Sequence, residues 1–333
     1  MRKIALAVLA FSCVAHAQTG LIVGSGNFFS PIVSDLDKAI AFYRDGLGLD
    51  VQGTPANADT NPALRNMFGL PDASLRWTVA RPPAMRTGVE IVEIKKAESK
   101  PAGRRVQDSG AFTLIVLVRD VDAAFARIKQ TGAPVITTGG APVRVGATAK
   151  AVVVKDPDGH FVEIAQVDPA AATAAPDTAN VVGVRVRLTV DDAGQAMRQY
   201  QELGLAGTMN VMPDRSESFN KLFGLKSDAQ YRLAAMDVPT SGLRFELIDF
   251  KGVDRRTVRA NIQDPGSTRM QLQVRDVDAA IAALKASGGT VVSAGGNTVD
   301  LPGRGGATTK VAIVRDPNNL FLVLLQAAPP RTP

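Results

Sequence analysis

Apolar and polar residues follow one pattern along the chain, and this pattern occurs four times. Each copy begins with an alternating run, continues with apolar residues at helical spacing behind an aspartate, and then reaches a glycine. Aspartate accepts hydrogen bonds from the free amides of a first helical turn, and glycine readily forms the left-handed turn that ends a helix. The four predicted helices follow Asp35, Asp120, Asp192 and Asp276.

Short runs typical of β-strands follow each predicted helix. They are rich in β-branched and aromatic residues, which favour strands. The clearest runs cover residues 89–94, 151–154, 161–164, 245–250, 310–314 and 320–325. One strand, one helix and about three further strands form a βαβββ module, and we expect four such modules in a protein of the α+β class.

The second half of the chain repeats the first. The sequence VRDVDAA occurs at residues 118–124 and again at residues 274–280. A repeat at this separation predicts two copies of one domain. We expect the first copy at residues 26–168 and the second at residues 182–327, joined by a linker at 169–181 that is rich in Ala, Pro and Thr.

The first seventeen residues resemble a secretory signal peptide. Arg2 and Lys3 precede an apolar stretch at residues 4–14, and Ala-His-Ala at residues 15–17 is a small-residue cleavage motif. We therefore expect an exported protein, periplasmic or extracellular, from which residues 1–17 are removed. The single cysteine, Cys13, lies in this leader, so disulfide and thiol chemistry are not expected after cleavage.

Charge and hydropathy argue against two classes of partner. The formal net charge is +6, but the basic residues form no longer run than pairs such as Arg104-Arg105, so we expect no nucleic acid. No segment after the leader is apolar for long enough to span a membrane. A small molecule is the partner that we expect, and the sequence leaves a homodimer open.

Two stretches resemble the signature sequences of the vicinal oxygen chelate superfamily. They are IVSDLDKAIAFY at residues 32–43 and DPDGHFVEI at residues 156–164. This superfamily contains glyoxalases, bleomycin-resistance proteins and extradiol dioxygenases. The resemblance extends over residues 26–326 and implies the glyoxalase-like fold, in which βαβββ modules pair into curved mixed sheets around a cleft. It leaves the reaction open, because this fold supports many chemistries.

The resemblance also implies where metal ligands would lie. In metal-using members, a histidine of each first strand and a glutamate of each last strand bind one divalent ion. The histidine lies seven residues before the cap aspartate, and the corresponding residues here are Phe28, Thr113, Arg185 and Arg269. The last strands contribute Glu90, Glu163, Glu246 and Val323. We therefore predict no cofactor, with Glu90 and Glu163 as weak candidates for a divalent metal.

His160 is the single histidine that follows the leader. Alternation in a strand places it on the face opposite Glu163. We expect it to follow the turn at residues 156–159 rather than to bind a metal.

Strand alternation assigns the remaining candidate residues to one cleft in each half of the chain. In the first cleft, Glu90 and Glu163 lie among apolar side chains, where burial raises the pKa of carboxylates and suits them to acid–base catalysis. This cleft is expected to contain Phe28, Thr113, Phe161 and Trp77 as ligand-binding residues. An apolar face of this kind is also typical of a domain or dimer contact.

The second cleft has a different character. It is expected to contain Arg185, Arg187, Arg269, Gln271 and Glu246. Guanidinium groups and amides suit planar anions such as carboxylates. The same arginines also fit a wetted sheet face on which they pair with Glu246.

Three functions follow from these patterns. The favoured hypothesis is an exported protein without a metal that binds a small apolar or aromatic molecule. The alternative is a divalent-metal-dependent enzyme that uses Glu90 and Glu163, as a glyoxalase-type lyase, an isomerase or an extradiol-type dioxygenase. In the third hypothesis the clefts bind another protein. Whether modules pair within a half, across the halves or between subunits is left open.

Overall fold

The computed structural model describes residues 20–51, 53–55, 57–83, 85–145, 149–168, 175–210, 212, 214–302 and 307–326. The predicted signal peptide and part of the predicted linker lie outside these ranges. No helix in the described ranges combines the length and the apolar character needed to cross a membrane.

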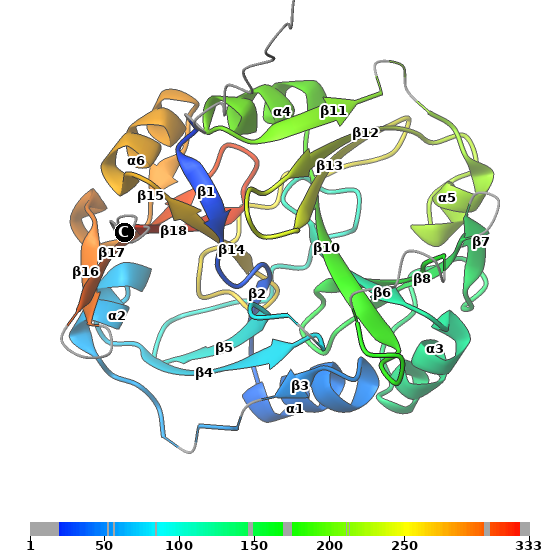
Figure 1. Cartoon of the computed structure of the whole chain (residues 1–333), viewed down its shortest axis with the longest axis horizontal. Coiled ribbons are helices and arrows are strands. Elements are labelled where there is room, and N and C mark those ends of the chain that lie inside the picture. Colours follow the sequence, from blue (N-terminus) through cyan, green and yellow to red (C-terminus); the bar gives the residue numbers. More distant parts are fainter. Residues whose placement is uncertain are drawn as a thin grey trace, which may run out of the picture.

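All four predicted modules are present (Figure 1). The first consists of β1 (Ile22–Ser25), β2 (Ser30–Val33), α1 (Leu36–Ala41), the π-helical turn η1 (Phe42–Gly46), β3 (Asp50–Val51), α2 (Pro62–Phe68), β4 (Ser74–Arg81) and β5 (Val89–Lys95). The second consists of β6 (Phe112–Val118), α3 (Val121–Gln130), β7 (Val143–Val145), β8 (Ala149–Lys155) and β9 (Phe161–Gln166).

The second half of the chain repeats these elements. The third module consists of β10 (Val181–Thr189), α4 (Ala193–Glu202), β11 (Ala206–Met209), α5 (Glu217–Leu222), β12 (Gln230–Asp237) and β13 (Arg244–Lys251). The fourth consists of β14 (Thr268–Val274), α6 (Val277–Ala286), β15 (Thr290–Val291), the 3-10 turn η3 (Ala294–Gly296), β16 (Val299–Pro302), β17 (Thr308–Arg315) and β18 (Phe321–Gln326).

The helices begin where the aspartate pattern predicts. In α3, the Asp120 carboxylate accepts a hydrogen bond of 2.9 Å from the Ala123 amide, and Asp35, Asp192 and Asp276 cap α1, α4 and α6 in the same way. Gly132 follows α3 with a φ of +73°, which is costly for other residues. The apolar side of each helix is buried against a sheet, so cap and periodicity together determine its position.

The modules combine into two sheets, and each sheet takes one module from each half of the chain. A ten-stranded sheet has the order β15-β17-β18-β14-β2-β5-β4-β3, with β1 on β14 and β16 on β17. An eight-stranded sheet has the order β11-β12-β13-β10-β6-β9-β8-β7. The first module therefore pairs with the fourth, and the second pairs with the third. In Figure 1 the ten-stranded sheet lies on the left and the eight-stranded sheet on the right.

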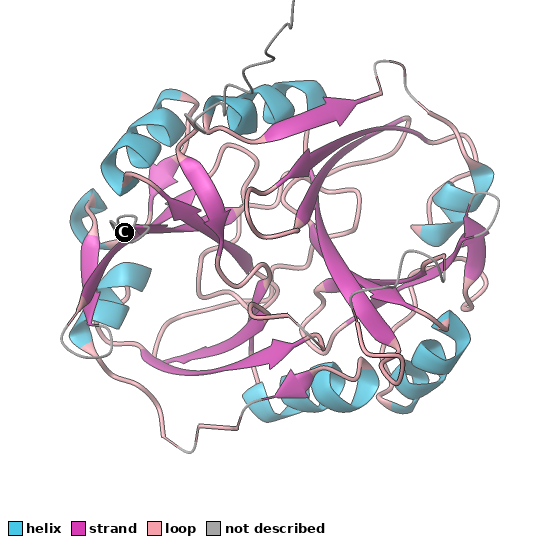
Figure 2. Ribbon diagram, viewed as in Figure 1, coloured by secondary structure: helices cyan, strands magenta, loops and turns pink. Residues whose placement is uncertain are grey.

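The helices lie at the periphery, outside the strands (Figure 2). One continuous apolar core lies beneath α1, α3, α4 and α6 and contains residues of all four modules. Each sheet has one smaller apolar cluster on the face opposite this core. The cluster of the ten-stranded sheet lies below α2, and that of the eight-stranded sheet lies below α5. We call these two faces the inner faces.

Two equivalent buried hydrogen bonds connect the sheets. The Tyr43 hydroxyl donates to Asp156 at 3.0 Å, and the Tyr200 hydroxyl donates to Asp316 at 2.8 Å. Burial and the adjacent carboxylate raise the pKa of both tyrosines well above their ordinary value. Each bond joins the two modules of one half of the chain. Because these two modules lie in different sheets, both bonds hold the two sheets together.

His160 follows the turn of the second module, as predicted. It is 2% exposed, and its Nδ1 lies 2.8 Å from Asp156 while its Nε2 lies 3.0 Å from the Ser267 carbonyl oxygen. It therefore takes part in the junction between the sheets.

Candidate functional site

Each inner face bears a cluster of charged and polar side chains where its two modules meet. In the ten-stranded sheet the cluster contains Glu90, Arg269 and Gln271. In the eight-stranded sheet it contains Glu163, Arg187 and Glu246. The central junctions place these residues together, because Arg269 is opposite Ser30 and Arg187 is opposite Thr113 in antiparallel strand pairs.

The two glutamates do not share a cleft, and this expectation was wrong. We assigned Glu90 and Glu163 to one cleft because they lie in the same half of the chain. The sheets pair modules across the halves, so Glu90 contacts arginine and glutamine from β14, and Glu163 contacts arginine from β10. The predicted arginine-lined second cleft is likewise divided between the two sheets.

A cavity of about 220 Å³ lies over the Glu90 cluster. Its walls are almost entirely apolar, and its polar residues are Glu90, Arg269 and Gln271. The apolar lining consists of Leu64, Met67, Phe68, Leu75, Trp77, Val92, Leu301, Val323 and Leu325. An apolar cavity with a few convergent polar groups is the usual form of a small-ligand site. We call it the sheet cavity.

Glu90 forms the centre of the polar floor of the sheet cavity. Its Oε2 accepts hydrogen bonds from Arg269 at 3.0 Å, from Gln271 at 2.9 Å and from the Ser30 hydroxyl at 3.3 Å. Within the described ranges, its Oε1 has only a long contact of 3.5 Å with the side-chain amide nitrogen of Asn27. Oε1 is therefore the better acceptor for a donor group of a ligand.

Arg269 is fixed by two kinds of contact. Besides its bond to Glu90, its guanidinium lies 4.6 Å from the centre of the Phe68 ring. The side chain is 1% exposed, and burial lowers its pKa, although Glu90 opposes this change. Its Nε has no hydrogen-bond partner in the described part of the chain. An unpaired buried donor costs free energy, and a hydrogen-bond acceptor on a ligand would remove this cost.

Trp77 lies at the rim of the sheet cavity. It is 44% exposed, whereas most large apolar side chains of the described residues are buried. It belongs to β4, where it pairs with Val92 of the cavity wall. A partly exposed indole at the opening of a cavity can cover a bound ring.

The corresponding face of the eight-stranded sheet is filled. Arg187 lies between two carboxylates, 2.5 Å from Glu163 and 2.6 Å from Glu246. The rings of Phe219 and Phe223 lie 5.9 Å and 5.4 Å from its guanidinium carbon. Contacts of Phe219 with Tyr231, and of Phe223 with Phe250, extend this aromatic cover over the inner face.

The ionic cluster of the eight-stranded sheet has shifted acid–base properties. Burial, with repulsion from Glu246, raises the pKa of Glu163, although Arg187 opposes this change. Burial disfavours the charge of Arg187, but the two glutamates outweigh this effect and raise its pKa. The sequence left open that arginines pair with Glu246 on a solvent-exposed sheet face. Arg187 does pair with Glu246, but the pair is buried.

The other predicted ligand residues lie apart from the sheet cavity. Phe28 is completely buried in the core beneath the helices. The chain between β1 and β2 departs from strand alternation, so Asn27, which we did not predict, reaches Glu90 instead. Thr113 and Phe161 are buried in the eight-stranded sheet, and Arg185 is partly exposed at 3.7 Å from Glu246.

The polar residues do not fit a divalent metal site. Among the described residues, no group of three or more His, Cys, Asp or Glu side chains is placed to hold a metal ion. Glu90 and Glu163 each bond to a buried arginine, whose positive charge repels a cation. His160 is the single histidine of the described ranges, and it lies at the junction of the sheets, so in this part of the chain neither inner face provides an imidazole ligand.

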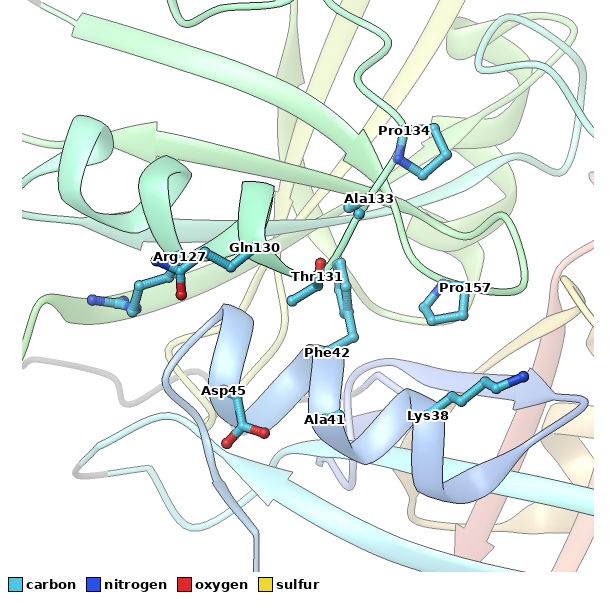
Figure 3. A pocket seen from close by; sticks show the side chains of 11 residues that line it. Lys38, Ala41, Phe42, Asp45, Arg127, Gln130, Thr131, Ala133, Pro134 and Pro157 are labelled. Atoms are coloured by element: carbon cyan, nitrogen blue, oxygen red, sulfur yellow. The ribbon is translucent and has the colours of Figure 1, made fainter.

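A separate hollow of about 480 Å³ lies on the outer side, between α1–η1 and α3 (Figure 3). Phe42, Ala41 and the loop from Ala133 to Pro134 form part of its wall. Lys38, Asp45 and Arg127 lie around it. It lacks the apolar enclosure of the sheet cavity, so the sheet cavity is the better candidate for a ligand site.

Comparisons with known proteins agree with this architecture. The family model described as Glyoxalase/Bleomycin resistance protein/Dioxygenase superfamily matches residues 27–164. Glyoxalase I from Zea mays is similar in structure, with a TM-score of 0.56 at 18% identity over 90% of this chain and 92% of that chain. A candidate dioxygenase from Bacillus subtilis has a TM-score of 0.52 at 12% identity, over 93% and 87% of the two chains. A search of curated proteins found no match.

Proposed function

We propose that this chain, whose residues 27–164 match the family model of the Glyoxalase/Bleomycin resistance protein/Dioxygenase superfamily, binds a small apolar or aromatic molecule in the sheet cavity. The observation that supports this proposal is the apolar cavity over a preformed polar floor of Glu90, Arg269 and Gln271. The low sequence identity of the structural relatives supports a shared fold and not a shared reaction.

The size of the cavity limits the ligand. Its volume of about 220 Å³ is below the range of roughly 300–1,000 Å³ that is usual for drug-sized ligands. A molecule with a single ring fits this space better than a fused or extended one. Trp77 at the rim then covers one face of the ring.

The polar floor limits the charge of the ligand. Arg269 and Glu90 neutralise one another at 3.0 Å, so a further buried charge would have no counter-ion. A neutral molecule with a hydroxyl or carbonyl group matches the hydrogen-bonding groups of the floor that are still available. The hydroxyl donates to Glu90 Oε1, and a carbonyl accepts from the second amide hydrogen of Gln271.

We also propose that the protein is exported, because residues 1–17 have the pattern of a signal peptide. A binding protein without metal in this location suits capture of an external compound. Detection of a mature N-terminus at residue 18 in the secreted or periplasmic fraction tests this part of the proposal.

Fluorescence tests the ligand proposal, because Trp77 is the single tryptophan of the chain. Titration with p-cresol is expected to change the Trp77 emission saturably, whereas benzoate, which bears a charge, binds at least about tenfold more weakly. Leu301→Phe narrows the sheet cavity and is expected to abolish the response. Leu233→Phe is the matched control, because Leu233 packs against the corresponding face of the eight-stranded sheet.

Two results would replace this proposal. If Leu301→Phe and Leu233→Phe alter p-cresol binding equally, the ligand does not occupy the sheet cavity. If the purified protein contains a stoichiometric transition metal that is lost on Glu90→Gln or Glu163→Gln, the metal-dependent lyase, isomerase or dioxygenase becomes the better hypothesis.

A further inference from the structure

Three cationic side chains near the junction of the two sheets lack ion-pair partners. Arg104, Lys155 and Arg315 have no carboxylate oxygen within 4.0 Å among the described residues. Lys155 and Arg315 lie instead over the rings of Phe161 and Phe321, at 5.1 Å and 4.5 Å. Arg104 is buried, and Lys155 and Arg315 are half-buried. Charges removed from water in this way are usually paired, so this group is unusual.

Arg104 is the most deeply buried of the three. It is 7% exposed, and among the described residues its one hydrogen bond is donated to the Val258 carbonyl oxygen at 3.1 Å. Its Nε has no partner in the described part of the chain. Burial, together with repulsion from Arg315, lowers its pKa to about 10. A guanidinium is costly to bury in this state unless an anion accompanies it.

Arg104 and Lys155 line the same small cavity, which has a volume of about 90 Å³. Phe112 of the eight-stranded sheet and Thr268 of the ten-stranded sheet also line it, so it lies between the two sheets. The remaining lining includes Gly110 and Gly266, which have φ values of +83° and +89°. We call it the junction cavity.

The carboxylates around the junction cavity are largely committed to other groups. Asp108 bonds to Arg105 at 2.9 Å. Asp264 accepts hydrogen bonds from two backbone amides and forms no ion pair within 4.0 Å. Asp158 lines the cavity and accepts a hydrogen bond from the Ser34 amide through one oxygen, while its other oxygen has no partner among the residues that the structure describes. Asp108 and Asp264 favour the charge of Arg104 from a distance, but neither lines the cavity. The lining itself contains Arg104 and Lys155 against the single carboxylate of Asp158, so it has an excess of positive charge.

We propose that the junction cavity binds one small oxyanion, no larger than phosphate or sulfate, between Arg104 and Lys155. The cavity of about 90 Å³ matches a small inorganic anion better than a larger organic one. Guanidinium and ammonium groups are the preferred donors to such oxygens. Because both sheets contribute to its lining, the anion would strengthen their association.

Calorimetric titration of the purified full chain with sodium phosphate and sodium sulfate tests this site. The buffer contains no chloride, and a bulky anion such as gluconate supplies the ionic strength. One saturable site per chain is expected. Arg104→Met is expected to weaken binding by about tenfold or more, because a charge-assisted hydrogen bond is lost. Arg198→Met is the control, because Arg198 is exposed.

Further measurements separate this site from others. Lys155→Gln is expected to weaken phosphate binding, and Leu301→Phe in the sheet cavity is expected to leave it unchanged. In the anion-free buffer, Arg104→Met is expected to unfold at the same temperature as the unchanged protein or higher, because an unpaired buried charge is removed. Added phosphate then raises the unfolding temperature of the unchanged protein more than that of Arg104→Met.

Three outcomes would overturn the proposal. The first is the absence of saturable binding. The second is equal binding by Arg104→Met and Arg198→Met, which means an adventitious ion only. The third is a marked loss of stability of Arg104→Met without added anion, since this would show that the protein itself compensates the charge of Arg104.

Discussion

Arginine has two different roles on the two inner faces. Arg269 bonds to one carboxylate and leaves one donor unpaired beside a cavity. Arg187 bonds to two carboxylates, and aromatic rings cover it. The number of glutamates beside each arginine thus distinguishes a face that can accept a ligand from one that is already filled.

Removal of Arg187 is expected to destabilise the protein strongly. Arg187→Met leaves Glu163 and Glu246 buried beside one another, and loss of one partner of a buried ion pair costs about 3–5 kcal/mol. Urea unfolding measures this change in the free energy of unfolding. Addition of Glu163→Gln to Arg187→Met is expected to restore part of the loss, and Arg185→Met, at a partly exposed side chain, is the control.

His160 is expected to make stability depend on pH. Burial disfavours its charged form, but Asp156 and the Ser267 carbonyl oxygen outweigh this effect and raise its pKa. Both neighbours are acceptors, so the protonated ring can donate to each. Its contribution is therefore complete below the ordinary pKa of about 6.5 and is lost as the pH rises through the higher pKa of the folded state.

Two measurements check this expectation. Proton NMR is expected to show the His160 ring titrating above its ordinary range. Unfolding free energies measured across the same pH range are expected to fall as the ring loses its proton, and His160→Gln is expected to remove this fall. A pKa below the ordinary value would contradict the hydrogen bonding described for the ring.

At the scale of elements, local pattern predicts position but not pairing. The aspartate caps and the buried apolar spacing locate α3 and α6, because both signals come from neighbouring residues. The short helices α2 and α5 were not predicted, since six or seven residues give too little periodicity. Strand alternation identified Glu90 and Arg269 as inner-face residues. It could not show that they meet, because their strands come from different halves.

The irregular chain before β2 illustrates a second limit. Phe28 and Asn27 differ by one position, and a single departure from alternation exchanges the faces on which they lie. The sequence contains no signal of this departure. The candidate site was therefore predicted in its residue types but not in its grouping.

At the scale of the whole molecule, the exchange of modules makes each half incomplete. Residues 20–168 contain the first and second modules, whose partners are the fourth and third. Isolated, this half exposes the edges of β2 and β6, which are liable to pair with another chain. We expect it to form a homodimer in which each sheet combines the first module of one copy with the second module of the other.

Light scattering after size-exclusion chromatography measures the mass of this half-chain. A dimer that retains the Tyr43–Asp156 contact is the expected species. A stable, folded monomer of residues 20–168 would show that modules of one half can pair directly with each other.

The position of β14 has one more consequence. Val274 pairs with Ile22 on one side and with Gln326 on the other, so the first and last strands of the described chain flank the same strand. Neighbouring strands are about 4.8 Å apart, which places these two ends roughly 10 Å from each other. A short peptide between them and a cut within residues 169–174 would yield a circular permutant that retains every strand pairing. Such a permutant would make the ten-stranded sheet from modules that are consecutive in sequence.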